Sequence, residues 1–205
     1  MGFLDALLGR SKPAGANLDR LFGLPGAAVT LQASEGLVSS GQAAVCFKPA
    51  VGQAFSATED ELTALLQADG DAAGAEGTAG TRTTVREDTD TYGYRWVVVE
   101  AAGVDDLVTR VHFVNSTLEA HGYGPQLLCS VFAFHPEGGA HPEATGRATY
   151  LVYLFKRGSF YPFVPTGREQ RDNEAELRLK AVLGGDLAIE AELDRWFPLW
   201  ELPIS

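Results

Sequence analysis

Residues 127–134 read LLCSVFAF, residues 148–155 read ATYLVYLF and residues 160–164 read FYPFV, and these three apolar runs decide the fold. The first run is almost continuously apolar, which is typical of a strand that is covered on both faces. No helical pattern separates the first two runs, so we expect them to form an antiparallel pair. A tight turn at residues 156–159 leads to the third run. There Pro162 favours an edge strand, because proline has no amide hydrogen to donate.

Helical patterns flank this group of strands on both sides. Residues 105–121 carry leucines and valines at helical spacing, and Gly122 follows as a stop. Residues 169–183 predict another helix, which ends at a pair of glycines. Strands with helices at intervals indicate an α+β fold, in which helices pack on a mixed or mainly antiparallel sheet.

The N-terminal half gives shorter signals. A helix is expected to begin at Asn17 and to end near Gly23. Its predicted inward-facing residues are Leu18, Leu21 and Phe22. The other elements predicted in this half are strands at residues 28–33, 43–49 and 92–100, and a helix at residues 58–70 that begins with a capping box.

The length of 205 residues suits one domain with short appendages. We expect residues 1–16 to form an N-terminal helix and linker, and residues 17–205 to form a single α+β domain. Residues 70–82 and 136–147 are rich in glycine and alanine and poor in large apolar groups, so we expect mobile loops there. Residues 190–204 hold two of the three tryptophans and are expected to dock on the domain.

The formal net charge of −11 disfavours binding to nucleic acid and to anionic membranes. No apolar run approaches the roughly 20 residues of a membrane-spanning helix. No basic region precedes an apolar stretch at the N-terminus, as it would in a secretory signal. We therefore expect a cytoplasmic protein, with at most peripheral contact at the inner face of the cell membrane. Cys46 and Cys129 lie within apolar runs and are expected to be small buried hydrophobes.

No catalytic motif is recognised in the sequence. It has no Gly-x-Ser-x-Gly nucleophile turn and no phosphate-binding glycine loop. His135 and His141 each precede Pro-Glu, but their loop is rich in glycine and alanine, whereas zinc ligands are normally held on rigid elements. We therefore expect no metal site, no cofactor and no enzymatic activity.

Residues 147–180 form a basic, aromatic-rich segment with a net charge of +3 in this acidic chain. Two helical pairs, Glu174–Arg178 and Glu176–Lys180, have the i,i+4 spacing at which opposite charges neutralise each other. Of the basic residues outside these pairs, four flank an aromatic strand and have no predicted partner. We call these residues the predicted contact surface: Lys156, Arg157, Phe160, Tyr161, Phe163, Arg168 and Arg171.

The predicted contact surface has three interpretations. Arginine beside exposed aromatic residues is typical of the energetic centre of a protein–protein interface. The same residues also fit an ordinary hairpin packed under a helix. The basic residues also suit a carboxylate or phosphate, as in a small-molecule or anion-binding protein or an unrecognised enzyme.

The N-terminal segment offers a second candidate surface. One helical face of this segment is formed by Phe3, Leu4, Leu7 and Leu8. Such a face can lie in a membrane interface. The segment has little positive charge and Asp5 opposes it, so packing on the domain or on a partner is the favoured interpretation.

Three longer blocks carry a family resemblance. They are MGFLDALLGRSKP at residues 1–13, LVTRVHFVNSTLEAHGYGPQLLCSVFAF at residues 107–134 and YLVYLFKRGSFYPFVPTGREQRDNEAELRLKAVL at residues 150–183, joined by RWFPLW at residues 195–200. Together they resemble the PspAB family of bacterial PspA-associated proteins. The resemblance implies a non-enzymatic cytoplasmic protein of the phage-shock response to envelope stress. The partner that it implies is PspA, a coiled-coil membrane-remodelling protein, or another component of that system. It supplies no catalytic residues.

Overall fold

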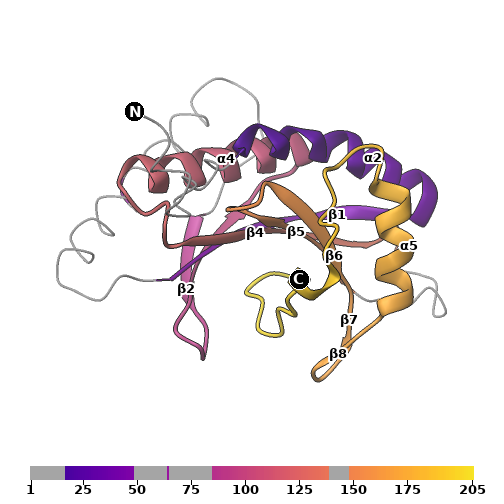
Figure 1. The fold of residues 1–205 in the computed structure, drawn as a ribbon. Helices are drawn as coiled ribbons and strands as arrows, with labels where there is room; N and C mark the ends of the chain where they lie inside the picture. Colours follow the sequence, from indigo (N-terminus) through magenta and orange to yellow (C-terminus); the bar gives the residue numbers. More distant parts are fainter. Residues whose placement is uncertain (1–16, 49–63, 65–84, 139–147) are drawn as a thin grey trace, which may run out of the picture.

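The computed structural model describes residues 17–48, 64, 85–138 and 148–205 (Figure 1). Four predicted segments therefore fall wholly or largely outside the described residues. These are the N-terminal helix and linker at residues 1–16, the helix at residues 58–70, and the loops at residues 70–82 and 136–147. The face formed by Phe3, Leu4, Leu7 and Leu8 belongs to the first of them.

A six-stranded sheet runs through the molecule in the order β2-β3-β1-β4-β5-β6, and each neighbouring pair is antiparallel (Figure 1). Its strands are β1 (Leu37–Phe47), β2 (Val85–Thr89), β3 (Arg95–Glu100), β4 (Leu127–Pro136), β5 (Thr149–Leu154) and β6 (Ser159–Phe163). A separate two-stranded ribbon joins β7 (Pro165–Gly167) to β8 (Gln170–Arg171). The predicted α+β fold and the predicted pairing of the runs now seen as β4 and β5 are confirmed.

The edge position that Pro162 indicated is confirmed, because β6 ends the sheet. The outer side of β6 is covered by the following chain. The amide of Phe160 donates to the carbonyl of Ala188 at 2.8 Å, and the amide of Glu190 donates to the carbonyl of Phe160 at 2.7 Å. These bonds satisfy backbone groups that an open edge strand would expose. We call residues 188–205 the C-terminal tail.

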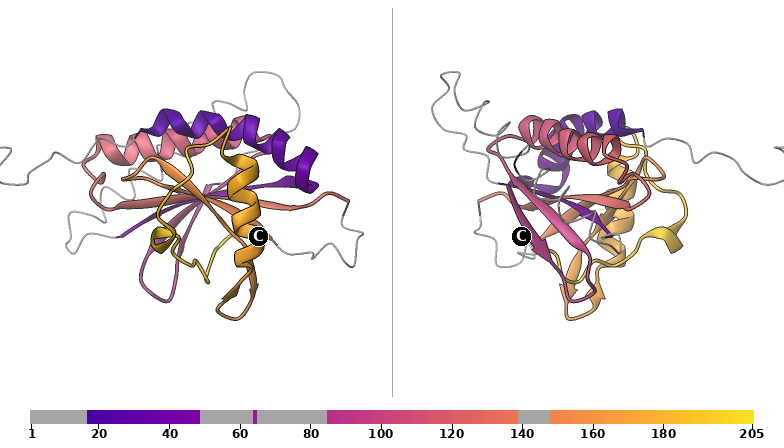
Figure 2. Two further views of the ribbon diagram at one scale, coloured as in Figure 1. Left: turned by 45° about the vertical axis from the view of Figure 1, so that its right-hand side comes forward. Right: turned by 90° about the vertical axis from the view of Figure 1, so that its left-hand side faces the viewer.

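Helices α2 (Leu24–Glu35) and α4 (Val104–Ala120) lie side by side across one face of the sheet (Figures 1 and 2). The short 3-10 helix η1 (Leu18–Gly23) leads directly into α2, and α5 (Asn173–Leu183) packs beside β6. The larger part of the core lies between these helices and the sheet. It includes Leu31, Val111 and Phe132, each at most 1% exposed.

The opposite face of the sheet is covered by the C-terminal tail, which contains the short 3-10 helix η2 (Leu193–Arg195). Trp196 and Ile204 are 5% and 4% exposed. Tyr161 donates its hydroxyl to the carbonyl of Phe197 at 2.7 Å, and Tyr150 donates to that of Ile204 at 3.1 Å. The predicted docking of residues 190–204 is confirmed.

The strand predicted at residues 28–33 is wrong, because this segment belongs to α2. Proline in the first helical turn and Gly36 at φ 64° mark the two ends of that helix. The prediction that Phe22 faces inward is also wrong: its side chain is 52% exposed. Leu18, Leu21 and Leu24 recur every three residues and are buried, which is the period of a 3-10 helix and leaves Phe22 off their line.

Two predicted boundaries also change. Residues 92–94 form the turn between β2 and β3, in which Asp90 Oδ1 accepts from the amides of Tyr92 and Tyr94 at 3.0 and 2.9 Å. The strand therefore begins at Arg95. The last helix begins at Asn173 because β7 and β8 occupy residues 165–171, and Asp172 caps it by accepting from the amide of Ala175 at 3.0 Å.

Candidate functional site

The aromatic part of the predicted contact surface lies in the core. Phe160, Tyr161 and Phe163 are 0%, 1% and 0% exposed. The Phe160 ring packs against Tyr153, with 5.0 Å between ring centres, and the Tyr161 ring stacks on Trp196 at 5.9 Å. The exposed aromatic strand that the sequence suggested is thus corrected: the hairpin is packed on both faces, and these rings are not accessible to a partner.

Arg157 is paired with a buried glutamate of the C-terminal tail. Its Nε donates to Oε2 of Glu190, and its Nη2 donates to Oε1 at 3.1 Å. Ser159 Oγ donates to the same Oε2 at 2.8 Å. The hydrogen bonds from Arg157, reinforced by Ser159, lower the pKa of Glu190 from 4.5 to about 2. The same pair raises the pKa of Arg157. Arg157 therefore fastens the tail to the end of β5 and β6.

Arg171 forms a second attachment for the tail. Its Nη2 lies 2.8 Å from Oε2 of Glu176, which is 2% exposed. Oε1 of Glu176 also accepts from the amide of Val164 at 2.9 Å. The Nη1 of Arg171 donates to the carbonyl of Trp196 at 2.6 Å, and the guanidinium lies 5.2 Å from the centre of the Phe163 ring. Arg171 is therefore a partly buried residue with a structural role.

The two predicted i,i+4 pairs do not form among the described contacts of α5. Glu176 is turned inward and binds Arg171. Arg178 reaches α2, where its Nε lies 3.1 Å from Oε2 of Glu35. The Nζ of Lys180 lies 5.8 Å from the centre of the Trp196 ring. Partners outside α5 therefore replace the predicted partners within it.

If the predicted contact surface bound a carboxylate or phosphate, its basic residues would have to converge on one cavity. Arg157 and Arg171 instead close around two different glutamates. Arg168 is exposed in the turn of the β7–β8 ribbon and lines a cavity of about 430 Å³ together with Glu169 and Glu201. The basic residues of the predicted contact surface therefore do not converge.

An exposed basic and aromatic surface does exist beside η1. Arg20 Nη1 donates to the carbonyl of Gly158, in the turn between β5 and β6, at 2.6 Å. Lys156 is exposed in the same turn. On the other side of η1, the Phe22 ring lies 5.1 Å from that of His112 on α4. We call Arg20, Phe22, His112 and Lys156 the η1 surface.

The base of the η1 surface is fixed to the core. Tyr153 donates its hydroxyl to the carbonyl of Asn17 at 2.8 Å, and burial raises the pKa of Tyr153 to about 12. The hydroxyl therefore stays protonated as a donor at neutral pH. Of the η1 surface, only Lys156 was among the predicted residues. The three-residue spacing of the buried leucines was the signal for the exposed position of Phe22.

Neither a membrane span nor a metal centre is found within the described part of the chain. It has no helix whose length and apolar character would let it cross a membrane. The same residues include no cluster of three or more histidine, cysteine, aspartate or glutamate side chains suited to a metal ion. His141, one of the two histidines that precede Pro-Glu, lies outside the described residues.

Comparison with known proteins places the chain in a family. A search of curated proteins and a search of solved structures give no significant match. A family model described as PspA associated protein B matches residues 1–204. The resemblance carried by the three sequence blocks is thereby confirmed over almost the whole length. The chain belongs to the PspAB family, PspA associated protein B.

Proposed function

We propose that this protein is a non-enzymatic cytoplasmic adaptor of the envelope-stress system, which binds a helical segment of PspA through the η1 surface. The family description supports an association with PspA. The observation that supports this contact is the exposure of Phe22, an aromatic side chain of η1 that is 52% exposed. The same short helix contacts the turn that contains Lys156 through Arg20, and it contacts α4 through Phe22.

The geometry of the η1 surface suits a protein contact. Phe22 rests on His112 and Arg20 is held by a backbone carbonyl, so little side-chain freedom is lost when a partner binds. Large aromatic and arginine side chains contribute most to interface energies. Asp19 approaches His112 Nε2 at 3.9 Å, on the α4 side of η1.

The distribution of charge favours one orientation of the partner. The chain as a whole carries −11, whereas Arg20 on η1 and Lys156 in the turn that Arg20 contacts are both exposed cations. A helix rich in glutamate would be repelled by most of the surface and attracted here, which favours one orientation of the complex. The attraction would be screened by salt, because both cations face solvent.

The proposal can be tested by measuring the affinity of purified protein for PspA from the same cells on a biosensor. We expect Phe22→Ala to weaken binding about tenfold or more. We expect Lys156→Glu to weaken it severalfold and to reduce its salt dependence. The matched control is Arg168→Glu, which makes the same charge change at an exposed position on the β7–β8 ribbon.

Two results would overturn the assignment of the η1 surface. One is an unchanged affinity in Phe22→Ala. The other is an equal loss in Arg168→Glu and Lys156→Glu, which would show an effect of net charge alone. If the unmodified protein does not bind PspA, direct association is refuted, and another component of the system would have to connect the two proteins.

A further inference from the structure

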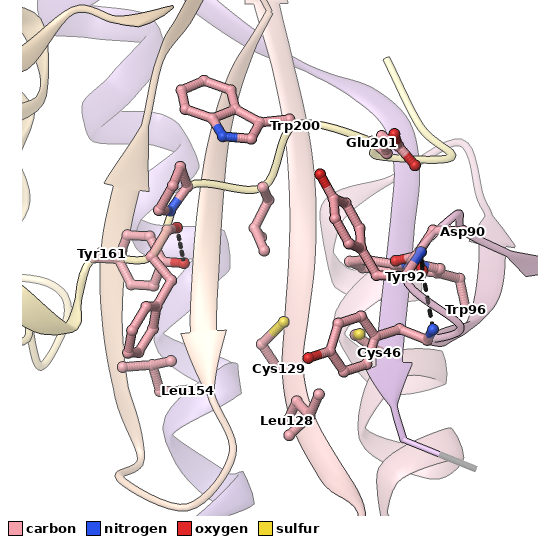
Figure 3. Close-up of a pocket in the computed structure, with 14 residues that line it drawn as sticks. Cys46, Asp90, Tyr92, Trp96, Leu128, Cys129, Leu154, Tyr161, Trp200 and Glu201 are labelled. Carbon is pink, nitrogen blue, oxygen red and sulfur yellow. Dashed lines mark hydrogen bonds between the residues drawn. The ribbon is translucent and has the colours of Figure 1, made fainter. Parts of the chain in front are cut away.

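A cavity of about 560 Å³ lies on the face of the sheet opposite α2 and α4 (Figure 3). This volume is within the range of small-molecule sites. The strands provide its floor, the turn between β2 and β3 provides one side, and the C-terminal tail crosses it with Trp200 and Glu201 (Figure 3). The cavity is separate from the η1 surface, so a ligand in the cavity is independent of the proposed function.

The floor of the cavity is apolar and uncharged. Cys46 on β1 and Cys129 on β4 are direct neighbours across the two strands and are 3% and 6% exposed. Both are free thiols. A hydrogen bond with Cys129, together with burial, raises the pKa of Cys46, so that thiol stays neutral at physiological pH. Neutral sulfur is polarisable and packs well against apolar ligands.

The walls of the cavity are aromatic. They comprise Tyr92, Tyr94, Trp96, Tyr161, Phe197 and Trp200. Tyr92 and Phe197 are 65% and 58% exposed, which is high for large side chains beside a cavity. These aromatic rings can stack on an organic ligand, and their negative π faces can attract a cation.

The formal charges on the described lining residues are all negative. Asp90 and Glu201 are ionisable carboxylates of the wall, and none of the lining residues that the structure describes is a lysine, an arginine or a histidine. Glu201 Oε2 accepts from the amide and the hydroxyl of Thr91 at 3.2 and 2.6 Å. The same turn contains Asp90, so both carboxylates are held at one end of the cavity.

Asp90 is fixed more firmly than Glu201. Its Oδ1 accepts from two backbone amides of the turn, and its Oδ2 accepts from Nε1 of Trp96 at 3.0 Å. A carboxylate that its own chain orients in this way presents a preformed negative charge. Binding of a cation beside it therefore requires little reorganisation.

We propose that this cavity binds a small organic cation with an apolar body, of the amphipathic amine or quaternary ammonium class. Aromatic faces beside fixed carboxylates recognise an ammonium group. The floor, which includes Leu128 and Leu154 beside the two thiols, accepts the apolar body. An anionic ligand would meet two carboxylates and the overall charge of −11.

The test uses three probes with the same alkyl chain and different head groups: decyltrimethylammonium, decyl sulfate and decyl maltoside. Binding to the full-length protein is measured by titration calorimetry below the micelle-forming concentrations. Tryptophan fluorescence, to which Trp96 and Trp200 of the cavity wall contribute, gives a second signal. We expect the cation to bind at least about fivefold more tightly than the other two probes, and this preference to shrink as salt is raised.

Two variants locate the preference in the cavity. Tyr92→Leu removes a π face but keeps an apolar side chain, and Glu201→Gln removes a charge but keeps an acceptor for Thr91. Each is expected to weaken cation binding about threefold or more and to leave maltoside binding unchanged. The control is Glu119→Gln, an exposed carboxylate on α4. Equal binding of the three probes, no binding of any probe, or an equal loss of cation binding in the control would each overturn the proposal.

Discussion

The buried pair between Arg157 and Glu190 gives the sharpest stability prediction. The change is Glu190→Gln, which preserves the shape of a side chain that is 2% exposed but removes its charge. The pKa of Glu190 is lowered from 4.5 to about 2. Each unit of pKa corresponds to about 1.4 kcal/mol, so the ionised group contributes about 3 kcal/mol to the free energy of unfolding.

The sign of the pH dependence follows from the lowered pKa. The contribution of Glu190 is complete above the unfolded pKa of 4.5 and is lost as the pH falls toward the folded pKa of about 2. We therefore expect the substitution to cost about 3 kcal/mol near pH 7, and about half of that near pH 3. In a chain of this length the larger value corresponds to a fall in Tm of roughly 6–12 °C.

The assay is urea unfolding at several pH values, followed by tryptophan fluorescence and circular dichroism. The control is Glu192→Gln. Glu192 also pairs with Arg157, at 3.4 Å, but its side chain is 50% exposed. Exposed pairs contribute about 0–1 kcal/mol, so the control should remain close to the unmodified protein. Equal stability of Glu190→Gln and the unmodified protein at both pH values would refute the reasoning, as would a difference that grows on acidification.

Two pairs of substitutions test the fold. In urea unfolding, Phe160→Ala should lower the free energy of unfolding by about 3–5 kcal/mol, because Phe160 is fully buried. The exposed Phe22→Ala should change it by less than about 0.5 kcal/mol, and similar losses in the two variants would contradict the assigned burial. Gly41→Ala should cost more than Gly36→Ala, by about 1 kcal/mol or more in thermal unfolding. Both glycines have positive φ, but only at Gly41 would a new Cβ lie 2.8 Å from the carbonyl oxygen of Ala101, and equal costs would contradict this contact.

The strands and the central helix could be predicted because their signals are local. The run that forms β4 is apolar at nearly every position, and β4 is covered on both faces. The helix α4 buries Leu107, Val111 and Val114 at helical spacing. In such elements the same face is buried along the whole length. The spacing of apolar residues in the sequence therefore reflects the packing.

The helix α2 could not be recognised in the same way. Its inward residues are Leu24, Ala27 and Leu31, but alanine and valine also occur on its other sides. Its apolar pattern therefore has no clear face. Gly36 also fits two structures, since a glycine at positive φ ends a helix as readily as it forms a turn between strands.

The charges of the candidate site were beyond local prediction. Arg157 pairs with a glutamate 33 residues later, and Arg178 bonds to one 143 residues earlier. Inspection of i,i+4 spacing detects neither. A buried glutamate such as Glu190 has the same sequence signature as an exposed one, because its burial results from the tail crossing the edge of β6.

The C-terminal tail is attached partly through side chains such as that of Glu190 and partly through its backbone, and the backbone part does not depend on the chemistry of the cavity that the tail covers. The carbonyls of Trp196, Phe197 and Ile204 accept from side chains of Arg171 and of residues on β5 and β6. A carbonyl is present whatever side chain the tail residue carries, so the attachment at these three positions does not depend on the identity of the tail residue. The character of the cavity wall is set independently by tail side chains such as that of Trp200. Substitution of Trp200 should therefore alter ligand preference while the tail remains docked, whereas loss of the Arg171 side chain would displace the wall itself.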